Sequence, residues 1–357
     1  MTAILGRPIN PVLGREVKER FRGIRGWIML SVYLALLAAV LFLAYQAAAS
    51  GSNDPFAGPS AASVAVVGRA IFEWLVLFMV LLVLFLVPAM TSGAIAGERE
   101  RQTLVPVQVT LMSPLGILLG KLGASLAFVT LLVFASLPFL AITYLVGGVT
   151  ITNVIVAIAS VLFVAIVVAC VGVACSSIFR RVQPATVIAY AVVLALVAGT
   201  FVAYGTWWLI DEARGTDTAN RAPAEFLLLN PLALVGDAVT TEDSADGSFL
   251  GSIALPLGGL DQLILESRAR GDLAGDVVTE QGFAIGPNGR EILRDFGSDV
   301  GDEEPIGFDR FNNPIFPSDV ETPLPFWVES VIAFYVLAVL AMFIGTRRLR
   351  TPAVAER

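Results

Sequence analysis

The chain has 357 residues, of which 56% are hydrophobic and only 15% are charged, and its mean hydropathy is +0.80. This composition is far too apolar for an ordinary soluble domain, so the chain is expected to be an integral membrane protein. It contains no His and only two Cys, which comes close to excluding metal sites built from imidazole or thiolate ligands. Without His, a serine or cysteine catalytic triad also lacks its usual base, so no enzymatic activity and no cofactor are expected.

Six apolar stretches are long enough, at roughly 20 residues, to cross the hydrocarbon core of a membrane as helices. They are expected at residues 27–46, 72–94, 122–146, 154–176, 184–210 and 326–346. A β-barrel would show alternating segments of about ten residues, so the predicted fold class is an all-α integral membrane protein. The mostly polar residues 1–26 precede the first stretch, and no clear cleavage context follows it, which favours a signal anchor over a cleavable signal peptide.

The first of the polar segments is expected to form an N-terminal interfacial amphipathic helix. Residues 9–24, INPVLGREVKERFRGI, place apolar side chains at helical spacing with charges elsewhere. A basic amphipathic helix directly before a span suits the membrane interface. The residues assigned to this helix are Arg15, Lys18, Arg20, Phe21 and Arg22. The alternative is a basic flank that only fixes topology.

Arg69 and Glu73 follow at the i, i+4 spacing near the outer end of the second stretch. A local ion pair is the expected arrangement, and a contact with substrate is the alternative. Between the third and fourth stretches, GGVTITN predicts a tight turn. Cys170 and Cys175 are five residues apart in the fourth stretch, a poor geometry for a disulfide, so they are expected to be small apolar residues of that helix.

The segment of residues 97–121, GERERQTLVPVQVTLMSPLGILLGK, ends in a sequence similar to a phosphate-binding loop and begins with a run of alternating charges. Its end is not a phosphate-binding loop, because three rather than four residues separate Gly116 from Gly120 and Leu122 follows Lys121. Lys121 is instead expected to snorkel at the inner end of the third span. Its beginning, GERERQTL, predicts a short charged helical element before Pro106 and Pro114 interrupt the chain. Such an element is suited to binding a soluble partner, and a solvated loop is the alternative.

Residues 211–325, between the fifth and sixth stretches, hold most of the acidic residues. From Asp211 to Phe326 there are 22 Asp and Glu against 7 Arg and no Lys, a net charge of −15 that leaves +8 for the rest of the chain. The apolar runs EFLLLNPLALVGDAV and LGSIALPLGGLDQLILES are too short to span and suit short helices on the outer membrane surface or a re-entrant hairpin. Residues 268–321 are rich in Asp, Glu and Gly, and no fold is predicted for them.

The positions of Lys and Arg predict the orientation. They gather before the first stretch, between the second and third, between the fourth and fifth, and in the tail 347–357, all on one side of a six-span topology. The positive-inside rule assigns that side to the cytoplasm of a plasma-membrane protein. Both termini are therefore expected inside, and the acidic loop outside.

The run SGAIAGERERQTL, followed by VTLMSP and LGKL, resembles the permease subunits of type 2 ABC transporters. The opening NPVLGREVKERFRG, the spacing of six spans, the large outer segment and the RRLR tail are similar too, so only the acidic outer region is not covered. Two positions depart from the family pattern: Gln102 stands where a Gly usually precedes the Thr, and Thr110-Leu111 replaces the usual Thr-Pro, with Pro106 upstream.

The resemblance implies that residues 96–114 form the coupling segment that contacts a separate ATPase subunit. It assigns this contact to Glu98, Arg99, Glu100, Arg101 and Thr103. It also implies an ABC exporter with a second permease, the same or homologous, that works among membrane lipids and binds no nucleic acid. The substrate is not predicted, although the apolar spans suit a lipid-like or amphipathic one.

Two rival functions belong to other classes. A membrane receptor or scaffold could use the acidic outer loop to bind a cation, a peptide or an envelope protein, although no D-x-[DN]-x-[DN]-G calcium loop is present. An ion channel is less favoured, because no span carries a recognisable ring of polar residues or a filter-like loop. A P-loop ATPase encoded beside this protein would favour the exporter.

Overall fold

The structure, a computed structural model, describes residues 24–50, 61–102, 114–214, 224–240 and 325–350, with residues 257, 260, 264, 307–308 and 314–315. Within these residues, six helical segments are long and apolar enough to cross a membrane. They are Gly26–Gln46, Val67–Glu100, Leu115–Val146, Ile151–Ile178, Val182–Trp207 and Phe326–Leu349. The predicted six-span, all-α class is therefore confirmed. The expected interfacial helix, with Arg15, Lys18, Arg20, Phe21 and Arg22, lies outside the described residues.

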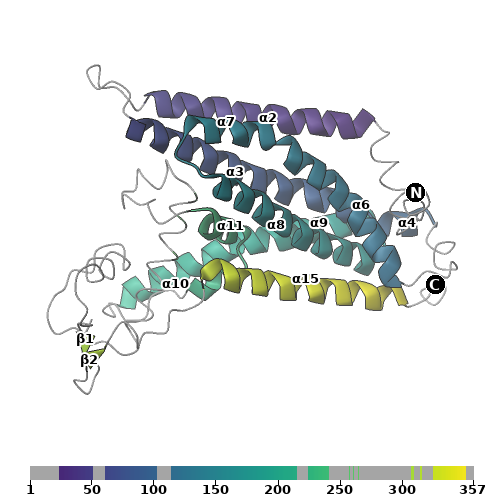
Figure 1. The fold of residues 1–357 in the computed structure, drawn as a ribbon. Coiled ribbons are helices and arrows are strands. Elements are labelled where there is room, and N and C mark those ends of the chain that lie inside the picture. Colours follow the sequence, from purple (N-terminus) through teal and green to yellow (C-terminus); the bar gives the residue numbers. More distant parts are fainter. Residues whose placement is uncertain are drawn as a thin grey trace, which may run out of the picture. The chain divides into compact units, whose positions relative to one another are not determined.

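Contacts divide the chain into two units, Met1–Ala195 with Ile332–Arg357, and Leu196–Val331. The first unit contains the helices α2 (Ile24–Ser50), α3 (Ala61–Thr91), α4 (Ala96–Glu100), α6 (Pro114–Ala135), α7 (Leu137–Val146), α8 (Ile151–Ile178), α9 (Val182–Leu194) and most of α15 (Phe326–Arg350). In Figure 1, α3, α6, α8 and α9 lie side by side. Here α3 contacts α2, α6, α7, α8 and α9, so it lies at the centre of this bundle.

The fourth span, α8, is the other central helix of the first unit. Every residue from Val167 to Ser177 is buried, and most of these are small. A helix that is buried on all sides must be approached closely by its neighbours. At Gly172 the approach is so close that an added Cβ would overlap Thr91 Oγ1 of α3. Cys170 and Cys175 are both buried free thiols in this helix.

The second span begins earlier than its apolar run suggests. Since α3 starts at Ala61, Arg69 and Glu73 lie well inside the helix, and Glu73 is only 2% exposed. Arg69 Nε lies 3.3 Å from Glu73 Oε1, which confirms the predicted local ion pair. Opposite charges one helical turn apart attract each other, which offsets the cost of burying them, so the helix can continue through this pair.

The third span is made of two helices, and it also starts early, at Pro114 rather than Leu122. The break between α6 and α7 falls at Ser136, two residues before Pro138, whose missing amide suits the first turn of α7. The span then ends in the predicted tight turn. Gly147 and Gly148 have φ of 105° and 80°, values that favour glycine, and Thr150 follows as the N-cap of α8.

The second unit begins within the fifth span. The π-helix η1 (Ala195–Gly199) joins α9 to α10 (Thr200–Arg214), and the 3₁₀ helix η2 (Ala224–Leu227) and α11 (Pro231–Val239) follow. A small core joins Leu227, Ala233, Ile264 and Phe326, with Phe201, Tyr204 and Leu228 packed against it. Strands β1 (Gly307–Phe308) and β2 (Pro314–Ile315) pair antiparallel, Gly307 opposite Ile315. They lie in the segment for which no fold was predicted.

Candidate functional site

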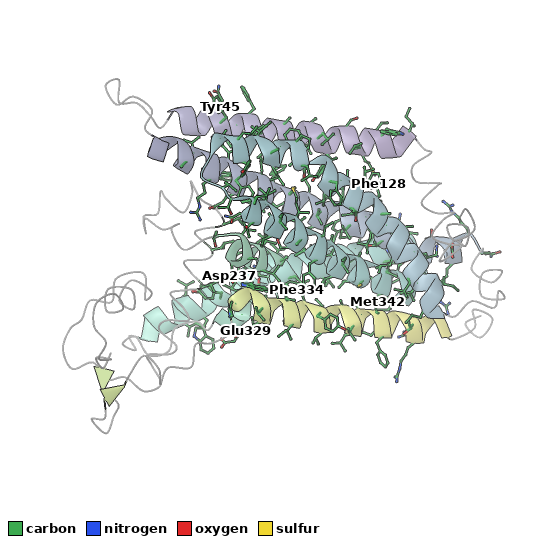
Figure 2. The ribbon with its side chains drawn as sticks, in the orientation of Figure 1. Tyr45, Phe128, Asp237, Glu329, Phe334 and Met342 are labelled. Carbon is green, nitrogen blue, oxygen red and sulfur yellow. The ribbon has the colours of Figure 1, made fainter. Side chains whose placement is uncertain are left out.

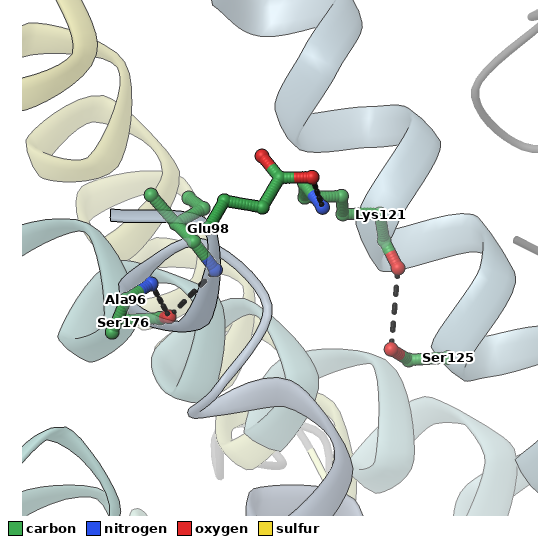
Figure 3. A network of polar contacts seen from close by, with 6 residues as sticks. Ala96, Glu98, Lys121, Ser125 and Ser176 are labelled. Carbon is green, nitrogen blue, oxygen red and sulfur yellow. Dashed lines mark hydrogen bonds and ion pairs between the residues drawn. The ribbon is translucent and has the colours of Figure 1, made fainter. Parts of the chain in front are cut away.

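The charged element between the second and third spans forms helix α4, which is only five residues long. So short a helix is unstable alone, and other parts of the chain hold it in place. At its N-terminus, Ser176 Oγ of α8 accepts hydrogen bonds from the amides of Ile95 (2.9 Å) and Ala96 (3.0 Å) (Figure 3). Ser176 is fully buried, and it satisfies two of the amides that a helix N-terminus leaves without a partner.

Small residues let the segment before α4 lie close to the beginning of α9. An added Cβ on Gly93 or Gly97 would lie 3.4 Å or 3.6 Å from the methyl groups of Val182. These two glycines are four residues apart, the spacing at which small residues allow membrane helices to approach. Beside them, Ser92 Oγ and Thr186 Oγ1 are 2.8 Å apart and share a hydrogen bond. The start of α9 therefore packs directly on the segment that leads into α4.

Glu98 joins α4 to the third span through an ion pair. Lys121 Nζ of α6 lies 2.8 Å from Glu98 Oε1, and the Lys121 side chain is only 4% exposed while that of Glu98 is 25% exposed (Figure 3). The prediction that Lys121 snorkels to the membrane surface is therefore wrong. Because α6 begins at Pro114, Lys121 lies two turns inside the helix, where a nearby carboxylate stabilises its charge.

The next two charged residues complement the ends of neighbouring helices. Glu100 Oε1 accepts a hydrogen bond from the amide of Val182 at 2.9 Å, at the first turn of α9, where a negative charge is favourable. Arg99 Nη1 donates to the carbonyl oxygen of Phe179, the C-cap residue of α8, at 3.5 Å, where a positive charge is favourable. Each charge in the GERE sequence therefore has a partner of opposite sign: Glu98 has Lys121, Arg99 has the carbonyl end of α8, and Glu100 has the amide end of α9.

Arg101 and Gln102 follow as exposed residues. Gln102 has a φ of 58°, a left-handed conformation that ends the helical path. Thr103 and the rest of the segment up to residue 113 lie outside the described residues. Of the five residues assigned to the ATPase contact, three therefore make contacts within the chain, and Arg101 is exposed.

The partners of α4 on α8 and α9 were not identified from the sequence. Ser176 and Val182 lie some 80 residues further along the chain, as their contacts show. Hydroxyl and aliphatic residues in apolar helices have no pattern that singles them out. The one available signal was the pair of glycines four residues apart just before the charged run, which indicates close helix packing without naming the partner.

Taken together, these contacts tie one short charged helix to α6, α8 and α9 at one end of the bundle. Residues 11–260, well over half of the chain, match the protein family described as ABC-2 family transporter protein. The chain belongs to this family. It is a multi-pass permease of an ABC transporter, and the family implies an ABC ATPase subunit as its partner. A comparison with curated proteins finds no match.

Proposed function

We propose that this ABC-2 permease belongs to an ATP-driven exporter and that its ATPase subunit binds at α4 and the residues that follow it. The observation that carries the proposal is the set of contacts that fasten α4 to three spans through Glu98, Arg99 and Glu100. Arg101 and Gln102 remain exposed beside this anchored helix. A partner that binds the exposed residues thereby acts on a firmly held element.

The contacts of α4 determine where a displacement would go. The backbone connects α4 directly to the end of the second span. Its side chains extend this connection to Lys121 of α6, to the carbonyl end of α8 and to the amide end of α9. Closure of the ATPase subunits would therefore move the ends of several spans together, as rigid elements that are packed side by side.

The basic residues support the proposal that the α4 end faces the cytoplasm, as an ATP-driven partner requires. Arg99 lies in α4 and Arg101 directly follows it, while Arg180 and Arg181 lie in the short connection that α4 contacts. The positive-inside rule places such residues in the cytoplasm. With six spans, both termini would then lie in the cytoplasm of a plasma-membrane protein.

The remaining parts of the proposal come from the family. Two permeases, identical or homologous, would assemble with the ATPase subunits, and the path for substrate would lie in or beside the spans. Serine, threonine and tyrosine side chains are scattered through otherwise apolar helices, a composition that suits a lipid-like or amphipathic substrate. The rival function, a receptor or scaffold that uses the acidic loop, is not favoured by any contact among the described residues.

Replacing Arg101 with Glu tests the proposed contact. Because Arg101 is exposed, the change reverses a charge on the binding surface without removing one of the contacts that hold α4. We expect the recovery of the ATPase subunit with the tagged permease in mild detergent to fall about tenfold or more, because placing like charges opposite one another across an interface is strongly unfavourable. ATPase activity in the eluate should fall in parallel.

Arg347→Glu is the matched control, since Arg347 is also exposed but lies on α15, over the ring of Phe343. Recovery of the ATPase should be unchanged in this variant. Equal recovery from Arg101→Glu and the parent protein would contradict the assignment of the contact to α4. Reversal of Glu98 and Glu100 to Lys should also weaken recovery of the ATPase. These two residues hold α4 in place, however, so their variants could weaken binding by displacing α4, whereas the Arg101 variant tests the binding surface itself.

A further inference from the structure

Far along the chain from α4, the side chain of Asn230 makes four hydrogen bonds within the second unit. Its side-chain oxygen accepts from the amides of Leu232 (2.8 Å) and Ala233 (3.4 Å), so it is the N-cap of α11. Its amide nitrogen donates to Val197 O (3.3 Å) and Thr200 Oγ1 (2.9 Å) of the fifth span. Asn230 is fully buried, and it uses all the hydrogen-bonding positions that an amide side chain has.

The two acceptors of Asn230 lie where the fifth span changes its geometry. Val197 is inside the π-helix η1, and Thr200 is the first residue of α10. A π-helical turn is rare, occurs frequently at functional sites, and disturbs the regular pairing of carbonyl groups. The hydroxyl of Thr200 lies 2.9 Å from Leu196 O and 3.1 Å from Val197 O. Thr200 and Asn230 together therefore provide hydrogen-bond donors for the carbonyl groups of this irregular stretch.

The other end of α11 holds the sixth span. Asp237 Oδ2 accepts a hydrogen bond of 2.7 Å from the amide of Trp327, in the first turn of α15. Figure 2 shows Asp237 beside the beginning of this helix. A carboxylate there caps the helix and is favoured by its positive end. The core formed by Leu227, Ala233, Ile264 and Phe326 packs the same elements together.

From these contacts we propose that α11 is a clamp: Asn230 and Asp237 hold the π-helical stretch of the fifth span and the first turn of the sixth span as one body through the transport cycle. The division of the chain agrees with this role, since Val197, Thr200 and Trp327 all lie, together with α11, in the unit Leu196–Val331. Asn230 and Asp237 are thus positioning residues. They act through two spans and need not touch the substrate.

Asn230→Asp separates the two functions of Asn230. The carboxylate can still cap α11, because it accepts hydrogen bonds from the Leu232 and Ala233 amides, but it cannot donate to Val197 O. Hydrogen exchange would be measured by mass spectrometry on the full permease chain in lipid nanodiscs. We expect about tenfold faster exchange in peptides that cover residues 195–204, and no change in residues 231–236. Asp237→Ala should accelerate exchange in residues 325–331 instead.

Thr200→Val and Thr206→Val form a matched pair on α10. Thr206 is exposed, and among the described residues its hydroxyl bonds to Ala203 O of its own helix, whereas the hydroxyl of Thr200 accepts from Asn230. Thr200→Val should accelerate exchange in residues 195–204, and Thr206→Val should not. Unchanged exchange there in both Asn230→Asp and Thr200→Val would overturn the clamp.

A distance measurement tests whether the two spans move as one body. Spin labels would replace Val202 and Trp327, both exposed, in a chain with Cys170→Ala and Cys175→Ala. We expect one narrow distance distribution that does not change when the complex is trapped with ATP and vanadate, and a distribution at least twice as broad in Asn230→Asp. A shift of the parent distance on trapping would overturn the proposal. The exchange and resting-distance results do not depend on the ATPase, so failure of the proposed α4 contact would leave them standing.

Discussion

Lys121 shows how much one buried charge depends on its partner. The ammonium is almost fully removed from solvent, and Glu98, 2.8 Å away, is a carboxylate that offsets this desolvation. Removing one partner of such a pair leaves the other charge poorly solvated, whereas replacing both with apolar residues of similar size is often nearly neutral. The pair therefore determines the position of α4 more than it determines overall stability.

This asymmetry gives a prediction for three variants. Lys121→Met and Glu98→Met should each lower the free energy of unfolding by about 2 kcal/mol, the range for a hydrogen bond to a charged group. The double variant should be less destabilised than the sum of the two, since neither charge then lacks a partner. The stability loss of all three variants can be measured by heating the protein in detergent and using size-exclusion chromatography to quantify the folded protein that remains. Strictly additive losses would show that the two side chains do not interact in the membrane protein.

The sequence was informative at this scale only where partners are close along the chain. Arg69 and Glu73 are one helical turn apart, so their ion pair could be predicted from spacing alone. Glu98 and Lys121 are 23 residues apart, on two different helices. The apolar run also placed the start of the third span at Leu122, which made Lys121 look like a residue at the membrane surface.

At the scale of helices, the packing of α3 against α8 depends on one glycine. Thr91 Oγ1 donates to the carbonyl of Val87 at 2.8 Å, which fixes its side chain against Gly172. Glycine at this position costs helix stability but lets the two helices approach. Because α4 is held by Ser176, one turn further along α8, the spacing of these helices also affects the position of α4.

Gly172→Ala should therefore be destabilising. The new methyl group would overlap a side chain that is already hydrogen-bonded, and such overpacking costs about 1–3 kcal/mol. Gly205→Ala in α10 is the matched control, because an added Cβ there meets nothing within 4 Å. The control should be neutral or slightly stabilising in the same unfolding measurement. A neutral Gly172→Ala would mean that α3 and α8 are further apart than described.

Apolar length predicted the number and order of the spans, because every helix that crosses a bilayer needs about 20 such residues. It predicted their ends poorly, since charged residues that find a partner, such as Glu73 and Lys121, can lie inside a helix. The π-helical stretch Ala195–Gly199 has no local signal in the sequence. It is fixed by Asn230, which follows some 30 residues later.

For the whole molecule, the orientation in the membrane decides whether α4 can meet an ATPase. The fourth span offers a direct test, because α8 has 28 residues, about 42 Å of helix, and reaches from one face of the bilayer to the other. Ile151 begins it and is 58% exposed, and the exposed Arg181 follows its other end in the connection that α4 contacts. Each end can therefore carry a single cysteine as a reporter.

Ile151→Cys and Arg181→Cys, each in a chain with Cys170→Ala and Cys175→Ala, should react differently with a membrane-impermeant maleimide. The positive-inside rule predicts that intact cells label Ile151→Cys alone, and that Arg181→Cys becomes reactive only after the cells are permeabilised. Arg180, Arg99 and Arg101 remain in the Arg181 variant, so the charge bias that sets the orientation is retained. The opposite labelling would place α4 outside the cell, where no ATP-driven subunit could bind it, and the proposed ATPase contact at α4 would then be wrong.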